Sequence, residues 1–154
     1  MNRGKFHPEM EINFYHAAEG ALISAAVKLL EKIYAAGQRC VFYSPLEERL
    51  KIVDKTLWTF STDAFIPHGD RSLGFCEKQP IYFADCVENP NGAEALVIVD
   101  TLDYKNFKDF KKIIFIFEEN SQAEAAKALC DDLKKNGENV KYWKQNPKGW
   151  EKLA

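Results

Sequence analysis

Apolar and polar positions alternate along the chain with two different periods, and this pattern predicts strands and helices that follow one another. Residues 10–16 alternate with a period of two, which is typical of a strand. Residues 19–36 carry apolar positions three and four apart, which predicts a helix that Gly37 ends. Residues 39–43 then form a short apolar strand. Further strands are predicted at 81–84, 95–99, 113–117 and 139–143, and further helices over 44–58, 103–110 and 121–136.

Two of these strands, 95–99 and 113–117, are continuous apolar runs, as expected for strands that are covered on both faces. Strands that alternate with helices around such runs predict the α/β class, here a three-layer Rossmann-like domain with a mainly parallel central sheet. We expect a single domain over residues 10–154. Residues 1–9 are polar and irregular, which predicts a flexible N-terminal tail. The run 146–149, Asn-Pro-Lys-Gly, is expected to end the last strand and leave a short tail.

Two of the helices begin with explicit start signals. Residues 44–47, Ser-Pro-Leu-Glu, combine a serine cap, a proline at the first helical position and a glutamate for a capping box. Ser121 and Glu124 form a second capping box. The apolar positions expected to face the core are Leu46, Leu50, Val53 and Leu57 in the first of these helices and Ala125, Ala126, Leu129 and Leu133 in the second.

The segment 57–70 is rich in aromatic residues and connects the second helix to the next part of the sheet. Trp58 lies about 100° around the helix from the last residue of the apolar stripe, so it falls at the edge of the stripe. Ile66 precedes a proline and is expected to end a short strand, and residues 67–70 are expected to form a turn. Trp58 and Phe65 fit two interpretations, core aromatics or a partner-binding surface.

Composition places the chain among ordinary globular proteins, with 46% hydrophobic and 29% charged residues in 154. The net charge of −2 gives the whole molecule little attraction to nucleic acid. The charge is uneven, because from Lys127 onward seven lysines face four acidic residues. This lysine-rich end fits either a solvated surface or a landing site for an acidic partner.

The cysteines and the apolar runs limit the cellular setting. None of the four cysteines forms a C-x-x-C pair, so we expect neither a zinc site nor a disulfide framework. The first ten residues lack the apolar run of a secretory signal, and no stretch is long enough to span a membrane. We therefore expect a cytoplasmic protein without membrane association.

Motifs for nucleotide and metal chemistry are missing from the sequence. Neither G-x-G-x-x-G nor the P-loop pattern occurs, and no histidine has a metal-binding partner at the usual spacing. We expect no catalytic residue and no cofactor. The alternative is a small α/β enzyme with a site at the strand ends near His16, Asp85 and Asp100. The first of these is more simply explained as a capped or solvated imidazole, and the two aspartates as helix or loop caps.

The run Leu57-Trp58 followed by Phe65-Ile66-Pro67-His68 resembles the signature of the chi subunits of bacterial DNA polymerase III. The order of predicted elements and the chain length are similar to that family along nearly the whole chain. The resemblance implies a non-catalytic accessory subunit of the polymerase III holoenzyme. Such a subunit links the clamp loader, through its psi subunit, to single-stranded-DNA-binding protein. A helicase is a further possible partner of the psi-binding surface.

The resemblance also implies two binding surfaces. The psi-like surface would comprise Trp58, Phe65, Pro67 and His68. The acidic C-terminal tail of single-stranded-DNA-binding protein would bind along the last helix. The basic residues expected to serve it are Lys127, Lys134, Lys135 and Lys141. Cys130 and Asp131 depart from the pattern, because the family has an aromatic and a basic residue there. We expect no strong direct binding to DNA, given the net charge.

Overall fold

The computed structural model describes residues 10–60, 68–69, 80–84, 89, 92–102, 110–119 and 122–153, of which 58, 60, 68 and 69 are described by their backbone only. Residues 1–9 of the proposed flexible tail, residues 103–109 of the proposed helix at 103–110, and Ser121, Phe65 and Pro67 lie outside the described residues.

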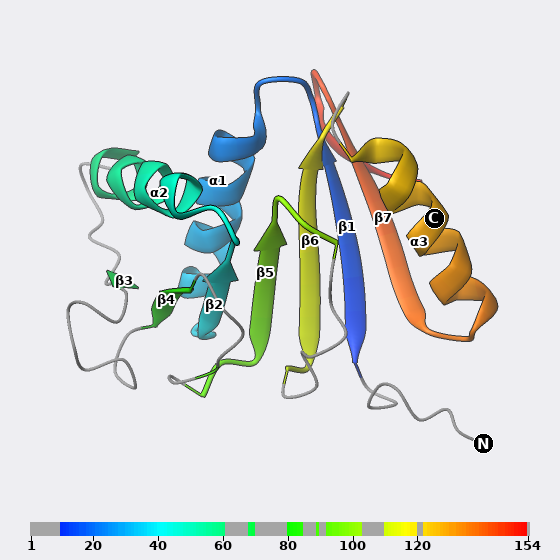
Figure 1. Ribbon diagram of the computed structural model, residues 1–154, viewed down its shortest axis with the longest axis horizontal. Helices are drawn as coiled ribbons and strands as arrows, with labels where there is room; N and C mark the ends of the chain where they lie inside the picture. Colours follow the sequence, from blue (N-terminus) through cyan, green and yellow to red (C-terminus); the bar gives the residue numbers. More distant parts are fainter. Residues whose placement is uncertain are drawn as a thin grey trace.

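One eight-stranded sheet forms the centre of the molecule, in the order β3-β4-β2-β5-β6-β1-β7-β8 (Figure 1). All neighbouring strands are parallel except β7 and β8, which form an antiparallel pair. The strands are β1 (Glu11–Ala17), β2 (Cys40–Tyr43), β3 (His68–Gly69), β4 (Ile81–Ala84), β5 (Ala95–Val99), β6 (Lys112–Glu118), β7 (Asn139–Asn146) and β8 (Gly149–Lys152). The expected α/β class with a mainly parallel sheet is confirmed.

Helices cover both faces of the sheet, which gives the expected three layers. The helices are α1 (Leu22–Ala35), α2 (Glu47–Phe60) and α3 (Ala123–Lys135). Apolar residues of α1 and α2 pack with one face of the sheet in a single buried cluster. Apolar residues of α3 pack with the opposite face in a second cluster. Both β5 and the centre of β6 are fully buried, because each lies between these two layers.

The two buried faces follow from the alternation of side chains along each strand. In β1, Ile12 and Phe14 belong to the cluster beneath α3, while Tyr15 and Ala17 pack on the α1 side. Phe14 stacks on Phe115 of β6 at 5.0 Å between ring centroids. Such pairs across neighbouring strands hold the register of a parallel sheet, because a slip by one residue would exchange its two faces.

The three described helices begin and end within three residues of the predicted bounds, but the start of α2 differs in two details. Leu46 is 52% exposed because it precedes the first turn of α2, so it does not belong to the apolar stripe. Ser44 caps α2 as expected, its Oγ accepting a hydrogen bond from the Leu46 N–H at 3.0 Å. The Ser44 N–H, however, donates to the Ala84 carbonyl at 3.2 Å, where a capping box would have directed it to Glu47. The Ser44 N–H therefore takes part in sheet pairing with β4 and is not available for a capping box with Glu47.

The buried stripe of α3 also differs from the prediction. Ala126, Cys130 and Leu133 face the sheet, whereas Leu129 is only partly buried and Ala125 is exposed. Both sets have helical spacing, and the prediction left cysteine out of the apolar positions. Because the Cys130 side chain faces the sheet, the exposed residues Lys127 and Asp131 lie at the edges of the buried stripe of α3.

The chain after Asn146 is a strand and not a loose tail. Residues 149–152 form β8, which pairs with β7 through a tight hairpin. The predicted turn at 67–70 is likewise corrected, since His68 and Gly69 form the short edge strand β3 beside β4. In both places a proline made the sequence look like the end of regular structure, while sheet pairing resumes just after it. None of the described helices is long and apolar enough to cross a membrane.

Candidate functional site

A pocket lies between α3, β7 and the residue that follows β8. Figure 1 shows α3 beside β7, with the C-terminus close to the same helix. Its volume is about 200 Å³. The lining residues are Lys127, Cys130 and Asp131 of α3, Tyr142 of β7 and Leu153 after β8. Tyr142 and Leu153 are brought together by the hairpin, since the Leu153 N–H donates to the Tyr142 carbonyl at 2.8 Å. The pocket therefore combines apolar walls with one cation and one carboxylate.

Tyr142 connects this pocket to a buried histidine. The Nδ1 atom of His16 lies 2.8 Å from the Tyr142 hydroxyl, and the His16 side chain is only 1% exposed. On the other side of the ring, Nε2 lies 2.7 Å from a carboxylate oxygen of Glu119, although it has no well-aligned hydrogen-bond partner among the described residues. Phe117 packs against both rings, at centroid distances of 5.1 Å from His16 and 6.0 Å from Tyr142.

Burial has the largest effect on the pKa values of His16, Tyr142 and Cys130. It lowers the pKa of His16, against the opposing effect of Glu119, so the imidazole is neutral at pH 7. Burial also raises the pKa of Tyr142 to about 12, with a further contribution from the nearby Cys130 and Glu119. The Cys130 thiol has a raised pKa for the same reason and is a poor nucleophile. The buried groups His16, Tyr142 and Cys130 are therefore neutral at pH 7. The charges of the pocket come from Lys127 and Asp131, so the site is equipped for binding by shape and charge.

The four lysines expected to bind an acidic tail do not lie together on one surface. Lys127 lines the pocket, and Lys134 is close enough that its charge lowers the pKa of the pocket residue Cys130. Lys127 and Lys134 are seven residues apart, which puts them on one helix face, while Lys135 lies about 80° away from Lys127. Lys141 lies on the opposite face of the sheet from Tyr142, where its ammonium is 3.5 Å from a Glu11 carboxylate oxygen.

Sequence reasoning missed the other walls of the pocket. Tyr142 supplies the aromatic side chain that α3 itself lacks at Cys130. The alternation of β7 is the signal that could have identified it, since Val140 and Tyr142 share the face toward α3. Leu153 carries no such signal, because the antiparallel return of β8 is what brings it to the pocket.

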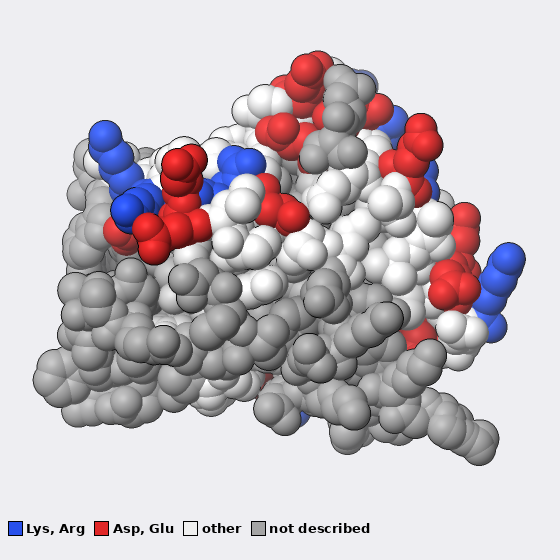
Figure 2. Space-filling view, viewed as in Figure 1, with Lys and Arg blue, Asp and Glu red and all other residues white. Residues whose placement is uncertain are grey.

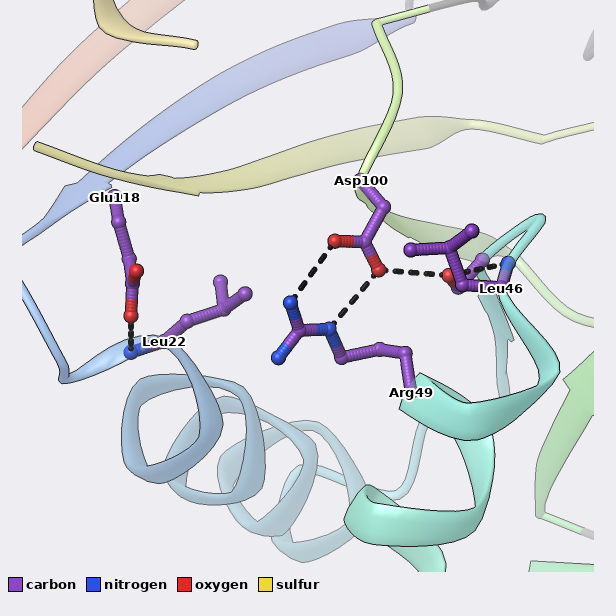
Figure 3. A network of polar contacts seen from close by, with 6 residues as sticks. Leu22, Leu46, Arg49, Asp100 and Glu118 are labelled. Carbon is purple, nitrogen blue, oxygen red and sulfur yellow. Dashed lines mark hydrogen bonds and ion pairs between the residues drawn. The ribbon is translucent and has the colours of Figure 1, made fainter. Parts of the chain in front are cut away.

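The two described residues of the alternative enzyme site, His16 and Asp100, lie at the ends of strands that are not neighbours in the sheet. Asp100 ends β5 and accepts hydrogen bonds from Arg49 at 3.0 and 3.1 Å and from the Ser44 hydroxyl at 2.8 Å (Figure 3). His16 is the last residue but one of β1, and β6 lies between β1 and β5 in the sheet. Asp85 lies outside the described residues. Asp100 therefore holds α2 against the sheet, in agreement with its interpretation as a structural group.

The first turn of α1, where doubly wound folds commonly bind phosphate, is bonded to a side chain of this protein. The Leu22 N–H donates to the Glu118 carboxylate at 3.0 Å (Figure 3). At α2 the Leu46 N–H is bonded to the Ser44 hydroxyl, which is in turn bonded to Asp100. A phosphate at the start of α1 would have to displace the Glu118 carboxylate. At the start of α2 a phosphate would be repelled by the Asp100 carboxylate. No group of His, Cys, Asp and Glu that could hold a metal ion occurs among the described residues.

Two of the four residues expected in the psi-like surface have a described backbone. The backbone places Trp58 in the last turn of α2 and His68 in β3. Their side chains, and the residues Phe65 and Pro67, lie outside the described part of the chain. Leu57, the neighbour of Trp58, is 5% exposed and belongs to the core beneath α2.

Comparison with known proteins gives a consistent result. A family model described as "DNA polymerase III chi subunit, HolC" matches residues 10–141. A protein named "Probable DNA polymerase III subunit chi", from Rickettsia prowazekii (strain Madrid E), is 32% identical over 152 residues. That alignment covers 94% of this chain and 92% of the relative. The region matched by the family model, residues 10–141, includes β1 to β6, the three described helices and the first three residues of β7.

Proposed function

Because this chain belongs to the family of DNA polymerase III chi subunits, we propose that it serves DNA replication as a non-catalytic adaptor of the polymerase III holoenzyme. In this proposal a psi-type subunit tethers it to the clamp loader. The pocket beside α3 captures the acidic C-terminal tail of single-stranded-DNA-binding protein. The helix N-termini that are already bonded to Glu118 and Ser44 support an adaptor without nucleotide chemistry.

The observation that carries the tail-binding role is the composition of the pocket. Tyr142 and Leu153 offer apolar surface for a hydrophobic terminal side chain, and Lys127 offers a charge for carboxylates. Lys134 extends the positive charge along the same helix face. Asp131 opposes an anion at one point of the rim, so the acidic groups of a ligand would lie toward the lysines.

Calorimetry with a peptide of the single-stranded-DNA-binding tail tests this role. We expect micromolar binding, about −8 kcal/mol. Lys127→Glu and Lys134→Glu should weaken binding at least tenfold, about 1.4 kcal/mol each, and leave folding intact because both side chains are exposed. Lys135→Glu is the matched control within α3, and Lys28→Glu, an exposed lysine of α1, is the control on the opposite face of the sheet. No binding of the peptide by the native protein would refute the tail-binding role.

The second surface is proposed for the psi-type subunit, or for a helicase that uses the same place. Trp58 at the end of α2, with Phe65, Pro67 and His68, would form it. Rigid aromatic side chains are common hot spots, because they bury large area at small entropic cost. Trp58→Ala and Phe65→Ala should each cost about 2–4 kcal/mol of partner affinity.

Unfolding measurements on the same two variants separate a surface from a core role. Core aromatics would lose about 3–5 kcal/mol of stability on truncation to alanine. Loss of partner binding with near-native stability supports the proposed surface, while equal losses in both would place the rings in the core. Leu57→Ala is the matched control, because this neighbour is buried and should lower stability.

A further inference from the structure

We propose that His16 positions Tyr142 as a wall of the α3 pocket and links capture of an acidic peptide to uptake of a proton. The proposal rests on the tail-binding role of the pocket. It starts from a connected chain of side chains: pocket wall Tyr142, buried His16, and Glu119 at the end of β6. The chain runs from the pocket, through the protein interior, to a carboxylate that is 47% exposed.

A neutral imidazole satisfies this arrangement in one tautomer. The Tyr142 hydroxyl donates to Nδ1 of His16, and Nε2 carries the proton. A Glu119 carboxylate oxygen lies 2.7 Å from Nε2 without being aligned for a hydrogen bond. Because the hydroxyl is held at 2.8 Å and the ring packs on Phe117, Tyr142 has little freedom to turn out of the wall. His16 thus acts on the pocket through Tyr142, as a positioning residue.

Protonation changes this arrangement in a defined way. An imidazolium donates from both nitrogens, so Nδ1 becomes the donor and the Tyr142 hydroxyl must accept. The hydroxyl proton then turns to another acceptor, and a positive charge stands behind the pocket wall. Tyr142 itself stays protonated, because its pKa is raised to about 12.

The charges that face His16 come from three elements. Glu119, after β6, favours the imidazolium, while Lys144 of β7 and Lys127 of α3 oppose it. An acidic peptide in the pocket would neutralise Lys127 and add negative charge nearby. Both effects raise the pKa of His16, so binding takes up a proton. The affinity must then increase as the pH falls through the range in which the free imidazole titrates, below its ordinary value near 6.5.

The test is calorimetry of the acidic tail peptide between pH 7.5 and 5.0. In the native protein we expect the affinity to rise by about threefold to tenfold as the pH falls, which corresponds to a pKa increase of roughly half a unit to one unit. His16→Asn keeps an acceptor near Nδ1 but cannot titrate, so it should bind like the native protein at pH 7.5 and show no rise. His16→Leu removes the acceptor and should bind several-fold more weakly at every pH.

Glu119→Gln provides a second readout that a merely structural role would not change. Without the carboxylate the imidazolium is less favoured, so the rise in affinity should move to lower pH. NMR titration of the His16 ring should show its pKa increase when the peptide is bound. Should His16→Asn fail to fold, the NMR titration of the native protein carries the test of proton uptake. Tyr142→Phe, which keeps the aromatic wall and removes the hydroxyl that His16 holds, then tests the positioning and should bind several-fold more weakly at every pH, like His16→Leu.

The outcomes separate this inference from the proposed function. The same pH dependence in the native protein and His16→Asn, with an unchanged ring pKa on binding, would refute the role of His16 while the tail-binding role stands. No binding at any pH would refute both.

Discussion

At the scale of single residues, the structure depends on side chains that replace missing backbone partners. Each helix begins with N–H groups that have no partner within the helix. In α1 the Glu118 carboxylate accepts from the Leu22 N–H, although the two residues lie 96 positions apart in the sequence. This bond joins the end of β6 to the start of α1, and its negative charge also suits the positive end of the helix dipole.

Glu118→Ala should therefore destabilise the protein by about 1 kcal/mol, the usual cost of losing a helix cap. Urea unfolding measures the change. Glu31→Ala, which removes a carboxylate from the body of α1, is the control and should lie within about 0.5 kcal/mol of the native protein. If the two variants unfold alike, the Glu118 bond contributes nothing to stability.

The raised pKa of Tyr142 predicts that the protein loses stability in alkaline solution. Its pKa is about 12 in the folded protein, against an ordinary value of 10.0. Since the folded state holds the proton more tightly, this stabilisation is complete below pH 10 and is lost as the pH rises toward 12. Tyr142→Phe has no proton to lose, so its free energy of unfolding should fall less steeply in that range. Equal slopes for the two proteins would contradict the raised pKa.

At the scale of elements, two attachments position the proposed binding surfaces. The ion pair of Arg49 with Asp100 fastens the first turns of α2 to the end of β5. Asp100 holds a left-handed backbone conformation with a φ of 68°, which few side chains tolerate. The hairpin of β7 and β8 brings Leu153 to the pocket and places Trp150 against Tyr15 at 5.2 Å.

Breaking the attachment of α2 has a measurable cost. Asp100→Asn keeps a side chain that tolerates the left-handed conformation but removes the charge that Arg49 pairs with. We expect a loss of about 1–3 kcal/mol, because the Arg49 and Ser44 hydrogen bonds to a partly buried carboxylate are weakened. A double-mutant cycle with Arg49→Met isolates the pair. A coupling energy near zero would show that the pair does not hold α2.

The hairpin also protects an edge of the sheet. Ending the chain before Gly149 removes β8 and leaves β7 as an edge strand with unpaired backbone groups. We expect this truncated protein to self-associate and to bind the acidic peptide more weakly, because Leu153 is lost from the pocket. Light scattering after size exclusion measures the first effect. The single variant Leu153→Ala is the control, as it should weaken peptide binding and remain dispersed like the native protein.

At the scale of the whole molecule, charge determines what the protein can approach. Acidic and basic side chains stand side by side over α2 and α3 on the face shown in Figure 2. With a net charge of −2 the protein releases few counterions from nucleic acid. This supports attraction to a short acidic peptide at a local site over attraction to a long polyanion.

Direct binding to single-stranded DNA should accordingly be weak, with a Kd above about 10⁻⁴ M at physiological salt, at the weak end of non-specific binding. Fluorescence anisotropy with a labelled oligonucleotide at several salt concentrations tests this. Tight binding with a steep dependence on salt, in the absence of any partner, would contradict it and would redirect attention to the C-terminal lysines.

The sequence alone determined the class of fold and most of its elements. Periodicity located the described helices, all the longer strands and the two fully buried strands, because these signals depend on neighbours along the chain. The run from Leu57 to His68 also indicated the family that the comparisons show. Of the expected site residues, Lys127 was both named from the sequence and placed in the pocket by the structure.

Only the tertiary structure decided what surrounds that lysine. Tyr142, Leu153 and His16 reach the site from β7, from the end of β8 and from β1, so their proximity depends on strand order and not on spacing in the sequence. The same holds for Glu118 at α1 and for β8, which local signals marked as a tail. Contacts between distant segments depend on the order in which strands join the sheet and on how its edges pair, and strand order leaves no pattern in a short stretch of chain.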